Sequence, residues 1–229
     1  MRAWPCRLGG HAAAARCYSF AVVYDPPKKP LSPNERLVLG LAAAAFAALI
    51  AAEMLSDYRP AKLGIVCLFA SFPPLLVLHE FGHAVVARLL GWRVEGIYLG
   101  FGRPVTRFIL FGLRVEVRRL PVEGFVSVAP GNLVQPQLKS ALIYLAGPGV
   151  ELLLAAAVFT ATGSPSLAGP DTSLWTIALQ SMAIMAVLGA VMNLIPHTVA
   201  TQDGAAMSDG LGFLTSFVTP TSVFAERMK

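Results

Sequence analysis

Long apolar runs dominate the pattern of the chain. A helix needs about 20 mostly apolar residues to cross a bilayer. Four runs approach or exceed that length, and they cover residues 37–55, 63–90, 141–161 and 174–195. The pattern therefore predicts an α-helical multi-pass membrane protein with about four transmembrane helices.

The second apolar run contains a pair of prolines, Pro73 and Pro74. Proline is tolerated in the first turn of a helix, but in the interior it removes a hydrogen bond and clashes with the preceding turn. We therefore expect a break at residues 71–74 and a new helix from Pro74 to about Leu90. Gly91 follows at the position where a glycine commonly ends a helix.

A segment of different character separates the second and third runs. Residues 113–118 alternate between apolar and charged side chains, which is the period of a strand. Gly112 separates them from the mostly apolar residues 105–111, so the segment predicts a β-hairpin. Such a hairpin could pair with an extended substrate strand, or it could lie at the membrane interface with its arginines towards lipid headgroups.

Composition and charge agree with a membrane protein. Charged residues make up 14% of the chain, against roughly 25% in average soluble proteins, and the mean hydropathy is +0.64. The net charge of +5 comes from Lys and Arg that flank the apolar runs, which is a topology signal and gives no reason to expect nucleic acid. We expect an integral protein of the cell membrane with both termini cytoplasmic, although Arg59 and Lys62 oppose this orientation.

The predicted domain organisation is simple. Residues 1–35 contain scattered basic residues and a proline-rich stretch without a continuous apolar core, so we expect a flexible N-terminal leader. Residues 36–229 would then form one membrane-embedded domain. Within it, the residues that carry chemistry lie at about 73–215.

The second apolar run carries the sequence His79-Glu80-Phe81-Gly82-His83. Residues four apart lie on one face of a helix, so His79 and His83 can bind one Zn²⁺. Glu80 can accept a proton from a metal-bound water, which zinc makes a nucleophile at neutral pH. Ionisable groups inside a span cost roughly 2.5 kcal/mol or more. Their presence there favours a catalytic metal site over a polar cluster that only pins helices together.

A tetrahedral zinc site of this kind needs a third protein ligand. The other histidines are poor candidates, because His11 lies in the leader and His197 follows Pro196 just beyond a span. A carboxylate is the better candidate. Asp203 and Asp209 both lie just beyond the fourth run, and each is followed by glycine.

These motifs resemble the site-2 protease family of intramembrane zinc metalloproteases. The resemblance covers about residues 75–214, most of the chain. It is carried by the zinc motif at 79–83, by 99–102 (Leu-Gly-Phe-Gly), by 121–126 (Pro-Val-Glu-Gly-Phe-Val), by 146–148 (Ala-Gly-Pro), and by 193–196 (Asn-Leu-Ile-Pro) followed by Asp-Gly. Residues 91–140 are too few for an inserted peptide-binding domain beside the hairpin, so the chain resembles a minimal member.

The resemblance implies roles for further residues. It makes an aspartate after Asn193 the third zinc ligand, and it places Asn193 near the scissile carbonyl, where an amide donor can stabilise an oxyanion. Asn193 could equally cap the end of its helix. We prefer Asp209 to Asp203, because an apolar, helix-like pattern follows Asp209. Both aspartates lie farther from Asn193 than is usual in the family.

A second departure from the family pattern lies in the third run. The family usually carries an asparagine soon after the glycine-proline pair, and this chain has Glu151 and Leu152 in that region. Glu151 could be a site residue or could face a helix end, and from the sequence we favour a structural role.

The sequence thus predicts a zinc metalloendopeptidase that hydrolyses peptide bonds in or near the transmembrane segments of membrane proteins. Its partners would be the lipid bilayer and a membrane-protein substrate. The principal alternative is a non-catalytic membrane protein that binds a partner through a degenerate protease fold. A zinc or proton transporter is less favoured, because polar residues are clear in only two of the apolar runs. The oligomeric state, the substrate and the pathway stay open.

Overall fold

The computed structural model describes residues 32–56, 62–163, 173–201 and 204–228. Within them lie four helices that are long and apolar enough to cross a membrane, as the sequence predicted. They are α1 (Pro33–Ser56), α2 (Leu63–Leu89), α3 (Pro136–Thr162) and α4 (Leu174–Leu194). Most of the predicted leader, residues 1–31, lies outside the described residues.

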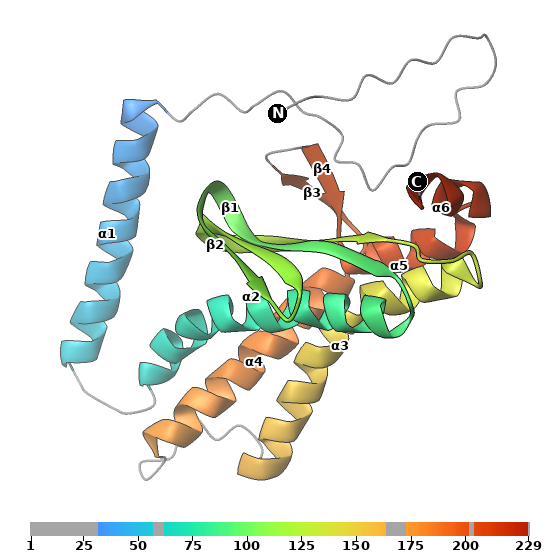
Figure 1. The fold of residues 1–229 in the computed structure, drawn as a ribbon. Coiled ribbons are helices and arrows are strands. Elements are labelled where there is room, and N and C mark those ends of the chain that lie inside the picture. The colour runs from blue at the N-terminus through green and yellow to red at the C-terminus, as the bar shows by residue number, and fades with distance from the viewer. Residues whose placement is uncertain (1–31, 57–61, 164–172, 202–203, 229) are drawn as a thin grey trace.

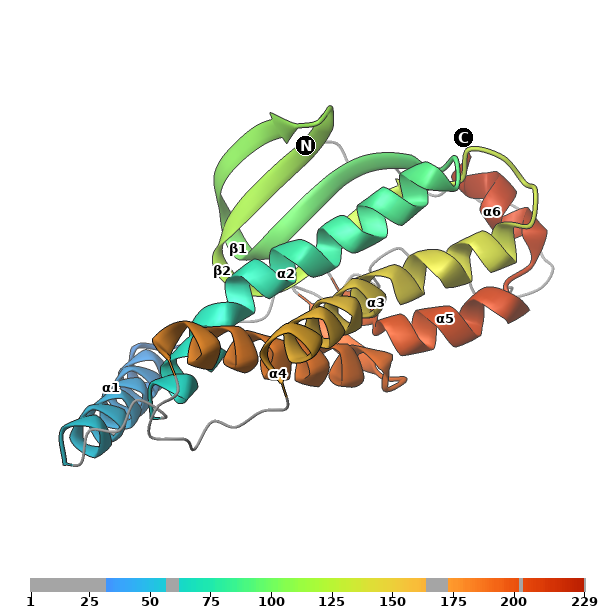
Figure 2. The same ribbon diagram turned by 90° about the horizontal axis from the view of Figure 1, so that it is seen from below.

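Helices α2, α3 and α4 form the core of the protein (Figures 1 and 2). Small and branched side chains from all three helices meet in one buried cluster: Leu75, Ala155, Val158, Ala183 and Ala186. Alanines at these contacts allow helices to approach closely, which is the usual way of packing helices in lipid. Many large apolar side chains elsewhere on the spans are exposed, among them Leu153 at 71% and Trp175 at 75%. A bilayer is the medium in which such exposure carries no cost.

Helix α1 stands apart from this core (Figure 1). None of the residues in its apolar window is buried. It meets the start of α2 through an edge-to-face contact of Phe46 with Phe69 and an ion pair of 2.7 Å between Glu53 and Lys62. The chemistry of the protein therefore has to come from the other three spans and the segments between them.

The predicted break at residues 71–74 is wrong, because α2 is one helix that runs through Pro73 and Pro74. In Figure 1 its first turns run at an angle to the rest. Prolines kink transmembrane helices without ending them when neighbouring groups satisfy the freed backbone. One turn before the prolines, the hydroxyl of Ser71 donates to the carbonyl of Cys67 at 2.6 Å.

The predicted hairpin is confirmed and is longer than expected. Strand β1 (Arg93–Leu110) pairs antiparallel with β2 (Leu113–Ala129). Phe111 and Gly112 form the two-residue turn with φ of 50° and 77°, as in the primed turns that favour hairpins. The hairpin also folds back on itself, since Ile97 lies opposite both Val126 and Val115.

One face of this hairpin packs on α2. The contact is a buried cluster of apolar side chains: Ala84, Ile97, Leu99, Leu113 and Val115. The hairpin therefore covers the part of α2 that carries the histidines. In both ribbon views it lies over one side of the helical core (Figures 1 and 2).

Four short elements follow α4. They are β3 (Thr198–Thr201), β4 (Gly204–Met207), α5 (Asp209–Val218) and α6 (Thr221–Arg227). The two strands pair as a small antiparallel hairpin. Helix α5 then returns along α3, and Phe224 of α6 is buried in a cluster with Ala87, Trp92 and Ile143. This return path brings the end of the chain back to the histidine-bearing part of α2.

Candidate metal centre

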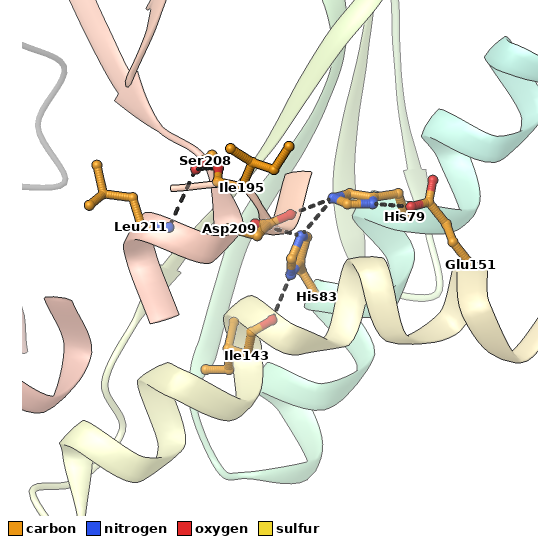
Figure 3. A network of polar contacts seen from close by, with 8 residues as sticks. All are labelled: His79, His83, Ile143, Glu151, Ile195, Ser208, Asp209 and Leu211. Carbon is orange, nitrogen blue, oxygen red and sulfur yellow. Dashed lines mark hydrogen bonds and ion pairs between the residues drawn. The ribbon is translucent and has the colours of Figure 1, made fainter. Parts of the chain in front are cut away.

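The two histidines of the zinc motif lie side by side on α2, as their spacing predicts (Figure 3). Their Nε2 atoms are 3.0 Å apart. Both residues are buried, with exposed fractions of 6% for His79 and 8% for His83. Two imidazole nitrogens are thus directed at one point inside the protein.

Asp209 completes the group from the other side. Its Oδ2 lies 3.0 Å from Nε2 of His79, and its Oδ1 lies 3.3 Å from Nε2 of His83 (Figure 3). Burial alone would raise the pKa of this carboxyl, but when no metal is bound the charge of a protonated His83 and hydrogen bonds from both imidazoles lower the pKa to about 2. Asp209 is therefore an anionic oxygen donor at neutral pH.

Ser208 fixes the position of Asp209 at the start of α5. Its Oγ accepts from the backbone N–H of Leu211 at 3.3 Å, which is the standard N-cap interaction. The same hydroxyl donates to the carbonyl of Ile195 at 2.8 Å (Figure 3) and accepts from the N–H of His197. A side chain at Gly210 would collide with the carbonyl of Leu194. These contacts hold the first turn of α5 against the end of α4.

Helix α3 supports both histidines. Nδ1 of His83 lies 2.6 Å from the carbonyl oxygen of Ile143. Because a carbonyl can only accept, Nδ1 carries the hydrogen and Nε2 of a neutral imidazole keeps its lone pair for a metal. A Cβ at Gly147 would collide with Nε2 of both histidines, so this glycine leaves the room in which the donor atoms meet.

Glu151 is the site residue that sequence reasoning assigned to a structural role. It is buried on α3, and its Oε2 lies 3.2 Å from Nδ1 of His79 (Figure 3). The sequence signal was present, since a carboxylate inside a span is unusual. What the sequence did not show is that α3 crosses α2 at the level of His79.

Glu80 is buried next to the histidines, with an exposed fraction of 4%. Strand β2 passes directly over its side chain, because a Cβ on Gly124 would lie 2.6 Å from Oε1 of Glu80. Only a glycine allows the strand to approach this closely. The hairpin and the predicted general base are therefore neighbours.

Donor types and spacing at this point fit a zinc ion. One ligand atom from each of His79, His83 and Asp209 can be chosen so that all lie within 4.8 Å of one another. Two imidazoles and one carboxylate are a ligand set of catalytic zinc sites, which leave the fourth position open for water or substrate. The space kept by Gly147 and the hydrogen bond that frees Nε2 of His83 agree with that use.

Two predicted residues are not placed in this group. Asn193 lies in the last turn of α4 with its side chain half-buried, and it makes no hydrogen bond to another part of the described chain. Its role as an oxyanion donor stays a prediction. Asp203, the alternative third ligand, lies outside the described residues.

Part of the chain is similar in sequence to known proteins. Residues 67–168 match the model of peptidase family M50. A protein of Helicobacter pylori strain J99, named "Putative zinc metalloprotease", is 37% identical over 54 residues, which are 24% of this chain and 15% of that protein. A protein of the same description from Campylobacter jejuni is 28% identical over 123 residues, covering 48% of this chain and 33% of the relative.

The similarity thus spans a third or less of the length of these two relatives. The match to the family model covers the segment that contains α2 from Cys67, the β1–β2 hairpin and α3. The resemblance to site-2 proteases is confirmed by the family match. Residues 67–168 are thus similar to peptidase family M50, the site-2 protease family.

Proposed function

We propose that the protein is an intramembrane zinc endopeptidase that hydrolyses peptide bonds in or near the transmembrane segments of other membrane proteins. One observation carries the proposal. His79, His83 and Asp209 converge on one point, and Glu80 lies buried beside the histidines on the same span. The family match and the names of the relatives support a metalloprotease. The identity of the metal, the reaction and the class of substrate are the parts that we propose.

His79, His83 and Asp209 would hold the zinc ion. When bound, zinc lowers the pKa of a coordinated water to about 7 and polarises the substrate carbonyl. Glu80 takes the proton of the attacking water and later delivers it to the amide nitrogen that leaves. Its burial and its position one residue after His79 suit a base that works beside the ligands.

The location of the site supports a substrate inside the membrane. Both histidines and Glu80 belong to α2, one of the four helices that can span a bilayer. A peptide bond within a helix is already hydrogen-bonded and shielded, so the substrate has to unwind before hydrolysis. Strand β2 approaches Glu80 at Gly124, which favours the interpretation in which the hairpin pairs with an extended substrate strand.

The distribution of basic residues predicts the orientation of the protein in the membrane. Basic residues gather on the β1–β2 hairpin, including Arg103, Arg107, Arg114, Arg118 and Arg119. The positive-inside rule then puts the hairpin and both termini on the cytoplasmic side of the cell membrane. Glu116 accepts from Arg107 at 2.8 Å and from Arg118 at 2.9 Å, so part of this charge is internally paired.

The test separates catalysis from metal binding. Wild-type protein and the Glu80→Gln variant would be reconstituted in vesicles with a pooled set of single-span transmembrane peptides, and products would be identified by mass spectrometry. Bound zinc would be measured in the same samples. Glu95→Gln is a matched control, because Glu95 is an exposed carboxylate on β1.

The proposal predicts cleavage by the wild type and by Glu95→Gln. Glu80→Gln should keep zinc and lose at least about 100-fold in rate, the lower range for general acid–base catalysis. Cleavage by Glu80→Gln at the wild-type rate would refute the mechanism. A folded wild type that binds no zinc and cleaves none of the peptides would point instead to the non-catalytic binding protein.

A further inference from the structure

Three residues at intervals of four line one face of α3 opposite the histidines. Ile143 presents its carbonyl to His83, Gly147 keeps open the space between the imidazoles, and Glu151 approaches His79. Residues four apart lie on one face of a helix. At each of these three positions, this face of α3 therefore contacts the two histidines or leaves room for them.

Glu151 is the member of this face that calls for a physical explanation. Its exposed fraction is 4%, and a charged group at the centre of a span is costly and rarely kept without a use. Among the described residues, neither Oε2 of Glu151 nor Nδ1 of His79 has a hydrogen-bond partner, and the two atoms lie 3.2 Å apart. Each atom is thus the nearest partner for the other.

The neighbouring helix makes room for this carboxylate. A Cβ on Gly189 of α4 would lie 3.3 Å from Oε1 of Glu151 and 3.6 Å from Oε2. A larger residue at position 189 would crowd the carboxylate that faces His79. The position of Glu151 is therefore defined by α3, by α4 and by the imidazole on α2.

We infer that Glu151 is a positioning residue of the metal centre, which accepts the Nδ1 hydrogen of His79 and so directs Nε2 of that imidazole towards His83 and Asp209. The inference rests on the proposed zinc site and deepens it. A histidine that binds a metal through one ring nitrogen commonly donates the other N–H to a carboxylate or carbonyl, which fixes the tautomer and the ring orientation.

The two histidines are held by different acceptors. His83 donates to a backbone carbonyl, whereas His79 faces a carboxylate. Two neutral imidazoles and Asp209 would leave a bound divalent cation with a net charge of +1, and the carboxylate of Glu151, together with that of Glu80, would offset it. A low-dielectric interior favours such neutralisation. The carboxylate therefore supplies both orientation and charge, and the carbonyl of Ile143 supplies orientation.

The competing explanation is that Glu151 only ties α2 to α3. Measurements of metal binding distinguish the two roles. A tie between helices would affect the stability of the fold, whereas a positioning residue changes the affinity for the metal and the ligand field around it. Gln180 offers the matched control, because it is a fully buried polar side chain of α4 that lies near Thr162.

The experiment uses the full-length protein, purified in detergent. Zinc affinity would be measured by competition with a chelator, and the visible absorption of the Co²⁺-substituted protein would report the geometry of the ligands. The variants are Glu151→Gln, which keeps shape and an acceptor oxygen, Glu151→Ala, which removes both acceptor and charge, and Gln180→Ala. Circular dichroism and gel filtration would establish that each variant is folded.

Loss of an outer-shell partner typically weakens metal binding by about 10–100-fold. We expect Glu151→Ala to reach the upper part of this range, Glu151→Gln to lie between it and the wild type, and both to shift the Co²⁺ bands, with Gln180→Ala unchanged. Should Glu151→Ala fail to fold, the Glu151→Gln result decides. Folded variants with wild-type affinity and unchanged bands overturn the positioning role while the zinc site stands. A folded wild type without zinc affinity overturns both proposals.

Discussion

The two sides of the metal cluster are built in different ways. His79 and His83 come from the buried interface of α2 with α3, where each ring nitrogen Nδ1 already has an acceptor nearby. Asp209 comes from a short helix that follows the small β3–β4 hairpin. Its position depends on the hydroxyl of Ser208 and on the close approach that Gly210 allows.

The position of the histidines is determined locally in the sequence, whereas the position of Asp209 depends on long-range packing. The histidines converge because they are one helical turn apart, and any helix over residues 79–83 would bring them together. Asp209 converges with them only because the chain after α4 turns back along α3. Substitutions at or against the histidines should therefore lower zinc affinity strongly. Substitutions around Asp209 should lower zinc affinity in proportion to how far they loosen the placement of α5.

The largest effect is expected when a histidine is removed. His79→Ala or His83→Ala leaves two protein ligands, so zinc affinity should fall by more than the roughly 10–100-fold that loss of an outer-shell partner causes. Competition with a chelator would measure it. His197→Ala is the control, because the imidazole of His197 bonds to the nearby carbonyl of Ile195 and is not part of the cluster. Equal affinities for wild type and His83→Ala would contradict the assignment.

A smaller but still severe effect is expected at Gly147. The methyl group of Gly147→Ala would collide with both imidazoles, and overpacking of this kind costs about 1–3 kcal/mol, or roughly 5- to 150-fold in zinc affinity. Gly149→Ala lies on the same helix, and nothing lies within 4 Å of its added methyl group. Chelator titration of both variants should show loss of affinity in Gly147→Ala alone. Similar affinities in the pair would refute the packing argument.

The smallest effect is expected at Ser208, which caps the helix that carries Asp209. Ser208→Ala removes an N-cap worth about 1 kcal/mol, which corresponds to roughly fivefold in affinity if the loss falls on the placement of Asp209. Ser173→Ala removes the equivalent N-cap of α4, where Oγ of Ser173 accepts from the backbone N–H of Thr176 at 3.1 Å. That control should leave zinc affinity unchanged. A loss as large as that of His83→Ala would mean that α5 has no other support.

Sequence reasoning was most successful where the determinants are local. The spans, the hairpin around Gly112 and the histidine pair depend on composition, period and spacing, and the structure contains all of them. The break at Pro73 and Pro74 was predicted wrongly, because the rule against interior proline comes from helices in water. In a packed membrane helix, neighbouring groups can satisfy the carbonyls that prolines free, and α2 continues through both prolines.

Long-range features were harder to predict. The choice between Asp203 and Asp209 rested on an apolar pattern after residue 209, and α5 now begins there. Glu151 was assigned a structural role because its distance from His79 depends on how α3 packs against α2. No local pattern contains that information. A spacing of four between Ile143, Gly147 and Glu151 was visible in the sequence, but its meaning needed the position of the partner helix.

The most direct test of the account is the zinc content of purified, folded protein in the wild type, in Asp209→Ala and in Asp203→Ala. The account predicts about one zinc ion per chain in the wild type and in Asp203→Ala, and loss of the metal in Asp209→Ala. Retention of zinc by Asp209→Ala together with its loss in Asp203→Ala would move the third ligand to residue 203. Absence of zinc from the folded wild type would contradict the central claim.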